Sequence, residues 1–265
     1  MSDWSIHIPS AFRAETLVSK TMRTLAAGGI DPARATVWVP DDRQRSEYCA
    51  TLHDHGIYAP VCISPHDPVS KTLATIGEEP LGLGRSRNQI IDTRRRGDQI
   101  VFIDDDITGI ERATSPQTLE PVTDLAALFD QMFFQADAAS ATLWGLYPVA
   151  NAYFMKPRIT HNLTYIIGAL FGMRVTHRPH EYVVLDDKED FERSIRHYLA
   201  DGVVLRNQGV CIRSRFYNEP GGMQVARTEE RVTASAHWLA HQFPMLCSVN
   251  QKKDHTELRL RDKRK

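Results

Sequence analysis

Short apolar segments alternate with helical segments through the first 110 residues, and this alternation restricts the folds open to the chain. Each apolar segment suits a buried strand, and each intervening segment carries apolar residues at helical spacing. Strands and helices that alternate in this way form a parallel sheet, which binds ligands beyond the carboxyl ends of its strands. The expected strands are residues 4–8, 36–39, 59–63 and 100–103, and the expected helices are 14–25, 43–53 and 83–95.

The second half of the chain has a less regular pattern, which predicts antiparallel additions to the same sheet. Gly168 and Gly172 fall inside one expected strand and indicate a bend or a close approach of another group. No linker divides the chain, so we expect one α/β domain over residues 1–265, with a mostly parallel central sheet flanked by helices. The expected elements are helices 124–139, 191–199 and 229–241, strands 143–147 and 163–175, and a hairpin of 203–205 with 209–212.

Composition argues against a large electrostatic attraction to nucleic acid or membrane. The formal net charge is -1, so such a partner would have to meet a local patch. Residues 252–265 form one basic patch, and residues 94–96 form a second; a solvated tail and turn explain both equally well. The four scattered cysteines indicate a reduced, intracellular protein. No apolar stretch approaches the roughly 20 residues that span a bilayer, and no signal peptide is evident, so a soluble protein without a membrane partner is expected.

Three consecutive carboxylates, Asp104, Asp105 and Asp106, end the strand at residues 100–103. Because adjacent carboxylates repel one another in a folded protein, the triplet favours a bound cation. An apolar strand that ends in D-x-D is typical of enzymes that hold Mn²⁺ or Mg²⁺ on a diphosphate, with Asp104 and Asp106 as the metal ligands. A bare D-x-D is short and is more often an acidic turn, so the neighbouring motifs decide its meaning.

Two further motifs precede the triplet at positions where a nucleotide could bind. Residues 82–90 place Arg85, Arg87 and Asn88 at an expected helix start, where cations are unfavourable without a compensating anion such as a phosphate. The segment IPSAFR, residues 8–13, sets its proline, serine and arginine at the carboxyl edge of the first strand. The candidate substrate-binding residues of the IPSAFR segment are therefore Pro9, Ser10 and Arg13.

Together the motifs I-P-S-x-x-R, R-x-R-N and F-I-D-D-D resemble those of GT-A glycosyltransferases of the inverting family-2 type. The resemblance covers roughly residues 4–110 and implies a GT-A-like, Rossmann-like fold with a UDP-sugar donor. It also implies a nucleotide-binding half over residues 1–110 and an acceptor-binding half over residues 111–265. Asp104 and Asp106 would then serve the metal and the diphosphate, and Asp105 the ribose or sugar side.

The resemblance continues at the segment VVLDDKEDFERSIR, residues 183–196. This segment is similar to the acidic helix entry that bears the catalytic base in such enzymes, where a carboxylate deprotonates the acceptor hydroxyl. It departs from the family in having Asp186-Asp187 where Glu-Asp is usual. We therefore expect Asp187 to be the catalytic base, with Asp186 and Asp190 as alternates. Acids also favour a helix N-terminus through its dipole, which explains some of these charges.

A narrower resemblance rests on IPSAFR, FIDDDI, the NEPGGM segment (residues 218–223) and the tail ending TELRLR. This combination is similar to the phage TET-associated glycosyltransferases, which attach sugars to 5-hydroxymethylpyrimidines in DNA. It implies double-stranded DNA bearing hydroxymethylated bases, such as 5-hydroxymethylcytosine, as acceptor and the bacterial host cytoplasm as location. The DNA-facing surface would be the basic tail and loops. His255 is a further candidate metal ligand by the same family reasoning.

Several alternatives remain open from the sequence. The acceptor could instead be a saccharide, a lipid or a protein, and a nucleotidyltransferase would share the nucleotide-binding half. A binding module that has lost turnover is a fourth reading, against which the intact acids argue. Four aromatic residues of the second half could stack on a sugar or a base, although core packing is the commoner role: Trp144, Tyr147, Tyr153 and Phe154.

Overall fold

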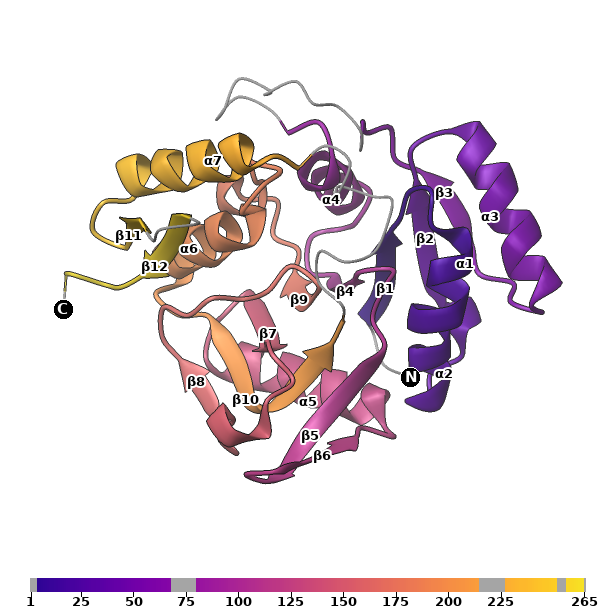
Figure 1. Cartoon of the computed structure of the whole chain (residues 1–265), viewed down its shortest axis with the longest axis horizontal. Helices are drawn as coiled ribbons and strands as arrows, with labels where there is room; N and C mark the ends of the chain where they lie inside the picture. Colours follow the sequence, from indigo (N-terminus) through magenta and orange to yellow (C-terminus); the bar gives the residue numbers. More distant parts are fainter. Residues whose placement is uncertain (1–3, 68–79, 215–226, 252–255, 265) are drawn as a thin grey trace.

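The computed structural model describes residues 4–67, 80–214, 227–251 and 256–264. Its main element is a sheet of ten strands in the order β3-β2-β1-β4-β9-β7-β10-β5-β6, with β8 paired to β10 (Figure 1). The strands are β1 (Trp4–Pro9), β2 (Ala35–Val39), β3 (Val61–Ile63), β4 (Gln99–Ile103), β5 (Gly109–Ser115), β6 (Thr118–Pro121), β7 (Leu143–Tyr147), β8 (Ile159–His161), β9 (Leu170–Arg174) and β10 (Leu205–Arg213).

The first four strands of the sheet are parallel, as the alternation of strands and helices predicts. β1 pairs in parallel with both β2 and β4, and β2 pairs in parallel with β3. Antiparallel pairing begins where β9 joins β4, and β7 also pairs antiparallel with β9. β10 pairs in parallel with β7 and antiparallel with β5. The predicted fold class, a mostly parallel central sheet with antiparallel additions from the second half, is confirmed.

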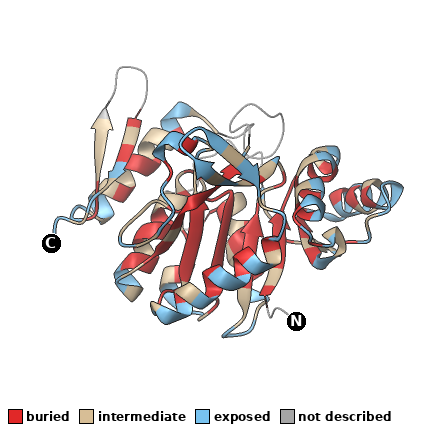
Figure 2. Cartoon of the chain, turned by 90° about the horizontal axis from the view of Figure 1, so that it is seen from below, coloured by how far each residue is buried: buried red, intermediate tan, exposed pale blue. Residues whose placement is uncertain are grey.

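Helices cover both faces of the sheet and bury the strands between them. Buried side chains of α1 (Ala14–Leu17), α2 (Arg23–Ala27), α3 (Asp42–Asp54) and α5 (Leu125–Ala138) belong to one apolar cluster. Those of α4 (Leu83–Asp92), α6 (Glu189–Asp201) and α7 (Glu229–Gln242) belong to a second. Figure 2 shows the central strands buried and much of the outward surface of the helices exposed.

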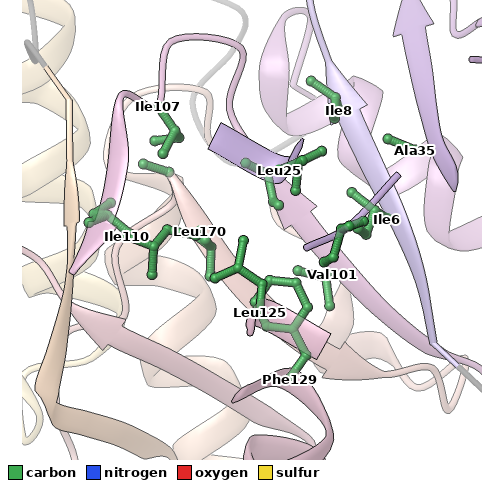
Figure 3. Close-up of a cluster of buried hydrophobic side chains, with 14 of the residues drawn as sticks. Ile6, Ile8, Leu25, Ala35, Val101, Ile107, Ile110, Leu125, Phe129 and Leu170 are labelled. Atoms are coloured by element: carbon green, nitrogen blue, oxygen red, sulfur yellow. The ribbon is translucent and has the colours of Figure 1, made fainter. Parts of the chain in front are cut away.

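Strand β4 contributes to both clusters, which explains why its sequence is apolar without alternation. Val101 and Ile103 pack in the first cluster, and Ile100 and Phe102 in the second. Figure 3 shows Val101 among Ile6, Leu125 and other residues of the first cluster. Because β4 is held on both faces, the acid triplet that follows it starts from a rigid position.

Two expected strands differ from the structure. Residues 203–205 and 209–212 were expected as a hairpin, but the structure has the single strand β10, which begins at Leu205 and runs through residues 209–212. Its pairing with β7 shifts register between Asn207 and Cys211. The expected strand at residues 163–175 is shorter, because only Leu170–Arg174 pairs. Gly172 makes the predicted close approach, since an added Cβ would lie 2.2 Å from the Trp144 ring.

The basic C-terminal segment is partly folded rather than a free tail. β12 (Thr256–Leu260) pairs antiparallel with β11 (Cys247–Gln251), and both contact α7. Thr256 and Leu258 are buried, while Arg261 and Lys263 are exposed. The hairpin lies beyond α7, on the side of the molecule away from β1 to β3 (Figure 1). Within the described ranges, no helix has the length and apolar character needed to cross a membrane.

Candidate active site

A cavity of about 390 Å³ lies at the carboxyl ends of β1 and β4, the edge predicted for ligand binding. Both halves of the chain contribute to its wall. From the first half come residues of the IPSAFR loop and the whole acid triplet, and from the second half come Tyr165, residues 167–169 and the acidic segment 186–190. Of the sequence-predicted residues, those that line the cavity are Pro9, Ser10, Arg13, Arg87, Asp104, Asp105, Asp106 and Asp187, together with the alternates Asp186 and Asp190.

Asp105 ties the first loop to the end of β4. Its carboxylate accepts a hydrogen bond from Ser10 Oγ at 2.5 Å and another from Arg13 Nη1 at 3.1 Å. The Ser10 hydroxyl also meets the Tyr48 hydroxyl of α3 at 2.7 Å. Burial raises the pKa of Asp105 above the usual range of an aspartate, and Arg13 opposes that shift. Both carboxylate oxygens of Asp105 therefore accept hydrogen bonds in this network, which fixes the shape of the IPSAFR loop.

A π-helical segment of the first helix holds the backbone of the acid triplet. The expected helix at residues 14–25 contains a π-helical stretch at Val18–Met22. In this stretch Thr21 donates its hydroxyl to the carbonyl of Asp104 at 2.7 Å and accepts the N–H of Ile107 at 3.0 Å. Such π segments are frequent at functional sites, and here the altered spacing brings Thr21 onto the loop after β4.

Arg87 joins the acid triplet to the acidic segment of the second half. Its side chain is 1% exposed and pairs with Asp104 at 2.7 Å, with the Glu189 carboxylate, and with the carbonyl of Gly168 at 2.7 Å. Glu189 also pairs with Arg193, so two guanidinium groups and two carboxylates balance in charge. An added Cβ at Gly168 would lie 2.6 Å from Glu189 Oε1, which explains the glycine.

The carboxylate oxygens of the triplet could bind a divalent cation. Asp104 and Asp106 both line the cavity. Burial raises the pKa of Asp104 to about 7; Arg87 opposes the shift, and the neighbouring Asp106 and Asp105 add to it. A cation among these oxygens would relieve the repulsion and favour the ionised form. Hard carboxylate oxygens are the ligands that Mn²⁺ and Mg²⁺ prefer, so the residues present suit such an ion.

The start of α4 does not present the anion site expected from the sequence. The N–H groups of Leu81, Gly82 and Gly84 donate to the carboxylate of Asp186, which supplies the negative charge that a phosphate was expected to supply. Asn88 uses both ends of its amide on the backbone of Val183. Neither Asn88 nor Arg85 is among the described residues that line the cavity. The start of α4 and Asn88 therefore bind residues of the second half of the chain rather than the predicted ligand.

Among the acidic side chains of the second half that line the cavity, two are candidates to accept a proton, Asp187 and Asp190. Asp187 pairs with Arg231 of α7 at 3.0 Å, and burial raises its pKa although Arg231 and Arg227 oppose the shift. Asp190 accepts a hydrogen bond from the hydroxyl of Tyr165 at 2.5 Å. Asp187 is 5% exposed, whereas Asp190 is half-buried.

Several residues of the site were not predicted from the sequence. Glu189, Arg231 and Tyr165 acquire their roles through partners far along the chain, which residue spacing does not reveal. The exception is the pair Glu189 and Arg193, whose i,i+4 spacing on one helix is a recognisable sign of an ion pair. His255 and the NEPGGM segment, both singled out in the sequence, lie outside the described residues.

Solved structures share this fold at low sequence identity. TarS from S. aureus has a TM-score of 0.50 and 12% identity, and the match covers 90% of this chain and 44% of that chain. A mycobacterial protein has a TM-score of 0.50 and 13% identity, with 97% and 83% covered. Glucosyl-3-phosphoglycerate synthase from Mycobacterium tuberculosis, solved with Mn²⁺ and UDP-glucose, has a TM-score of 0.49 and 13% identity, with 97% and 86% covered.

These likenesses establish the fold of the chain, which is the GT-A-like α/β fold that the motifs implied. No protein-family model and no curated protein matches the sequence.

Proposed function

We propose that this chain is a metal-dependent, inverting glycosyltransferase that uses a UDP-sugar as donor. The observation that carries the proposal is the position of the acid triplet, which follows β4 and lines a cavity at the edge where such sheets bind nucleotides. In this proposal residues 1–110 form the donor half and residues 111–265 the acceptor half of one domain. Asp104 and Asp106 would hold Mn²⁺ or Mg²⁺, which stabilises the departing diphosphate when bound.

The chain's own residues would prepare the donor site in two ways. Ser10 and Arg13 fix the first loop through Asp105, so that the loop presents a constant surface to the nucleotide. Arg87 neutralises part of the charge on Asp104 while staying buried. We propose that Arg87 is a positioning residue, because a direct phosphate contact would require it to leave two ion pairs.

We propose Asp187 as the general base, as the sequence predicts, with Asp190 as the competing assignment. Asp187 lines the cavity, and its raised pKa favours proton uptake from a hydroxyl. Asp190 is more exposed but binds the Tyr165 hydroxyl. The two can be separated with Asp187→Asn and Asp190→Asn. Loss of the base should lower kcat for transfer by about 100-fold or more while Mn²⁺ binding persists. If only Asp190→Asn has this effect, the base is Asp190.

We further propose 5-hydroxymethylcytosine in DNA as the acceptor, and the loop after β7 supports this choice. Pro148 and Val149 line the cavity, and Tyr153 and Phe154 follow them with 68% and 60% of their surfaces exposed. Exposed aromatic rings stack on unpaired bases, and an extruded base is the form in which a hydroxymethyl group could enter a cavity. Trp144, in contrast, is buried and packs in the core.

Cations accompany these aromatic rings. Lys156 and Arg158 are exposed immediately after them in the sequence, at positions where they could contact backbone phosphates. We therefore propose this loop, residues 148–158, as the DNA-facing surface, in addition to the exposed cations of the C-terminal hairpin. The phage origin and the host cytoplasm that the family resemblance implies belong to the same proposal.

The acceptor loop can be tested without disturbing the donor site. The double variant Tyr153→Ala/Phe154→Ala should raise the KM for hydroxymethylated DNA by about 10-fold or more, because each stacked base contributes about 1–3 kcal/mol. Hydrolysis of the donor without acceptor should stay unchanged. The matched control is Phe134→Ala, which removes a ring of α5 that is 70% exposed and does not line the cavity. An unchanged KM in the double variant would contradict the proposed surface.

The donor chemistry has its own test. Incubation with Mn²⁺ and a panel of nucleotide sugars should release UDP, and chelation of the metal should stop the release. Release of pyrophosphate would instead identify a nucleotidyltransferase. UDP release with transfer only to a saccharide, lipid or protein would keep the enzyme class and replace the acceptor.

A further inference from the structure

Two histidines and an aspartate form a compact cluster away from the candidate active site. His197 and Asp201 stand one helical turn apart on α6, and His180 comes from the short helix at Pro179–Glu181. One ligand atom from each of the three residues lies within 4.8 Å of the others. The two imidazole rings meet edge to face, with centroids 4.8 Å apart. None of the three residues lines the cavity of the candidate active site.

The cluster contains two ring nitrogens that are buried without a hydrogen-bond partner. These atoms are Nε2 of His197, a residue that is 0% exposed, and Nε2 of His180. A buried polar atom without a partner costs about 1–3 kcal/mol, so two of them in rings that contact each other need an explanation. A ligand that accepts electron pairs from both nitrogens would remove this cost.

The hydrogen bonds around His197 determine which of its nitrogens carries the proton. Asp201 Oδ2 accepts the hydroxyl of Thr142 at 2.5 Å and the Thr142 N–H at 2.9 Å. Since the Thr142 hydroxyl donates to that carboxylate, its oxygen must accept from His197 Nδ1, which lies 2.8 Å away. Nδ1 therefore carries the hydrogen, and Nε2 has a free lone pair. Histidine ligands of metals are held in this way by an outer hydrogen bond.

Asp201 also has an oxygen atom that could bind a metal. Asp201 uses Oδ2 on Thr142, which leaves Oδ1 as an oxygen ligand.

We propose that His180, His197 and Asp201 form a second metal site, which binds Zn²⁺ with water in the fourth position. Two imidazoles and one carboxylate are a common zinc ligand set, and small side-chain rotations would bring the three atoms to the tetrahedral distances of about 2.0–2.2 Å from the ion. Imidazole ligands favour Zn²⁺, whereas the carboxylates at Asp104 and Asp106 favour Mn²⁺ or Mg²⁺. The two sites would therefore select different ions.

A metal here would join the 3-10 turn at Pro179–Glu181 to the C-terminal part of α6. The chain between them runs through Val183, which binds Asn88, to the acidic segment that begins at Asp186 and lines the cavity. The bound ion would thus stabilise the wall of the active site from outside it. This role is structural and does not depend on the proposed reaction.

Zinc binding to the full-length, chelator-treated protein tests the proposal. The measurement is made in the Asp106→Asn background, so that the carboxylate site does not contribute. One Zn²⁺ should bind and raise the melting temperature, and Co²⁺ in its place should give the visible absorption of a tetrahedral ion. His180→Gln and Asp201→Asn should each weaken Zn²⁺ binding by about 100-fold or more, since loss of even an outer-shell partner costs about 10–100-fold.

The matched control is His241→Gln, which changes an exposed histidine of α7 and should leave the affinity for Zn²⁺ unchanged. In the wild-type background, His180→Gln should retain Mn²⁺ binding, and circular dichroism should show that the variant is folded. Equal Zn²⁺ affinities for the Asp106→Asn protein with and without His180→Gln and Asp201→Asn would overturn the site. So would a lack of Zn²⁺ binding by the Asp106→Asn protein itself.

Discussion

Arg87→Met would test the buried link between the two halves of the candidate active site. Arg87 is 1% exposed and bridges Asp104 and Glu189, so its removal leaves Asp104 without this arginine and Glu189 paired with Arg193 alone. Breaking a buried ion pair by removing one partner costs about 3–5 kcal/mol, because a buried charge is left uncompensated. We expect a loss of this size in the free energy of unfolding.

Urea denaturation followed by circular dichroism measures this loss, with Arg96→Met as a control at an exposed arginine, expected to cost less than about 0.5 kcal/mol. Arg87→Lys should fall between the two, since an ammonium group keeps the charge but not the fork that spans both carboxylates. Mn²⁺ binding at pH 7 should also weaken in Arg87→Met, because the pKa of Asp104 rises further without Arg87. A loss below about 1 kcal/mol for Arg87→Met would refute the reasoning.

Two other predictions follow from buried positions. Gly168→Ala should destabilise the protein by about 1–3 kcal/mol in urea denaturation, because its Cβ would meet Glu189 at 2.6 Å, whereas Gly109→Ala should be nearly neutral, since the nearest atom lies 3.8 Å away. Burial lowers the pKa of His7 to about 3 in the folded protein, whereas the pKa in the unfolded chain is about 6.5. Between these pH values, His7 is therefore protonated in the unfolded chain and neutral in the folded protein. Stability should therefore fall as the pH drops from about 6.5 towards 3, by about 1.4 kcal/mol per pH unit for this residue, and His7→Gln should flatten the measured slope by that amount.

The sequence was sufficient to predict the parallel half of the fold. Residues 100–103 are apolar on both faces, and the structure buries them between two clusters, so local pattern and tertiary position agree there. The pattern misled at residues 203–212, where two short strands of a hairpin were expected but one strand, Leu205–Arg213, continues through a shift of register. A strand that absorbs an irregularity and a hairpin have similar local sequences, and only the pairing with β7 distinguishes them.

The candidate site was predictable where its residues are neighbours in sequence, and less so where long-range partners decide. The acid triplet and IPSAFR line one cavity, because both follow parallel strands that end at the same edge. The anion at the start of α4 comes from Asp186, which is 105 residues from Leu81. No local pattern reveals such a partner, and so a helix start that was expected to bind phosphate binds a carboxylate of the chain itself.

We propose that the site around the acid triplet transfers a sugar to hydroxymethylated DNA. Mass analysis of a hydroxymethylcytosine oligonucleotide tests this most directly, after incubation with Mn²⁺ and each of several UDP-sugars and with UDP assayed in the same sample. We expect a mass gain of one sugar and an equal amount of UDP, both absent with unmodified DNA, after chelation, and with Asp106→Asn. Transfer that persists in Asp106→Asn, or no UDP release with any donor and acceptor, would contradict the proposed function.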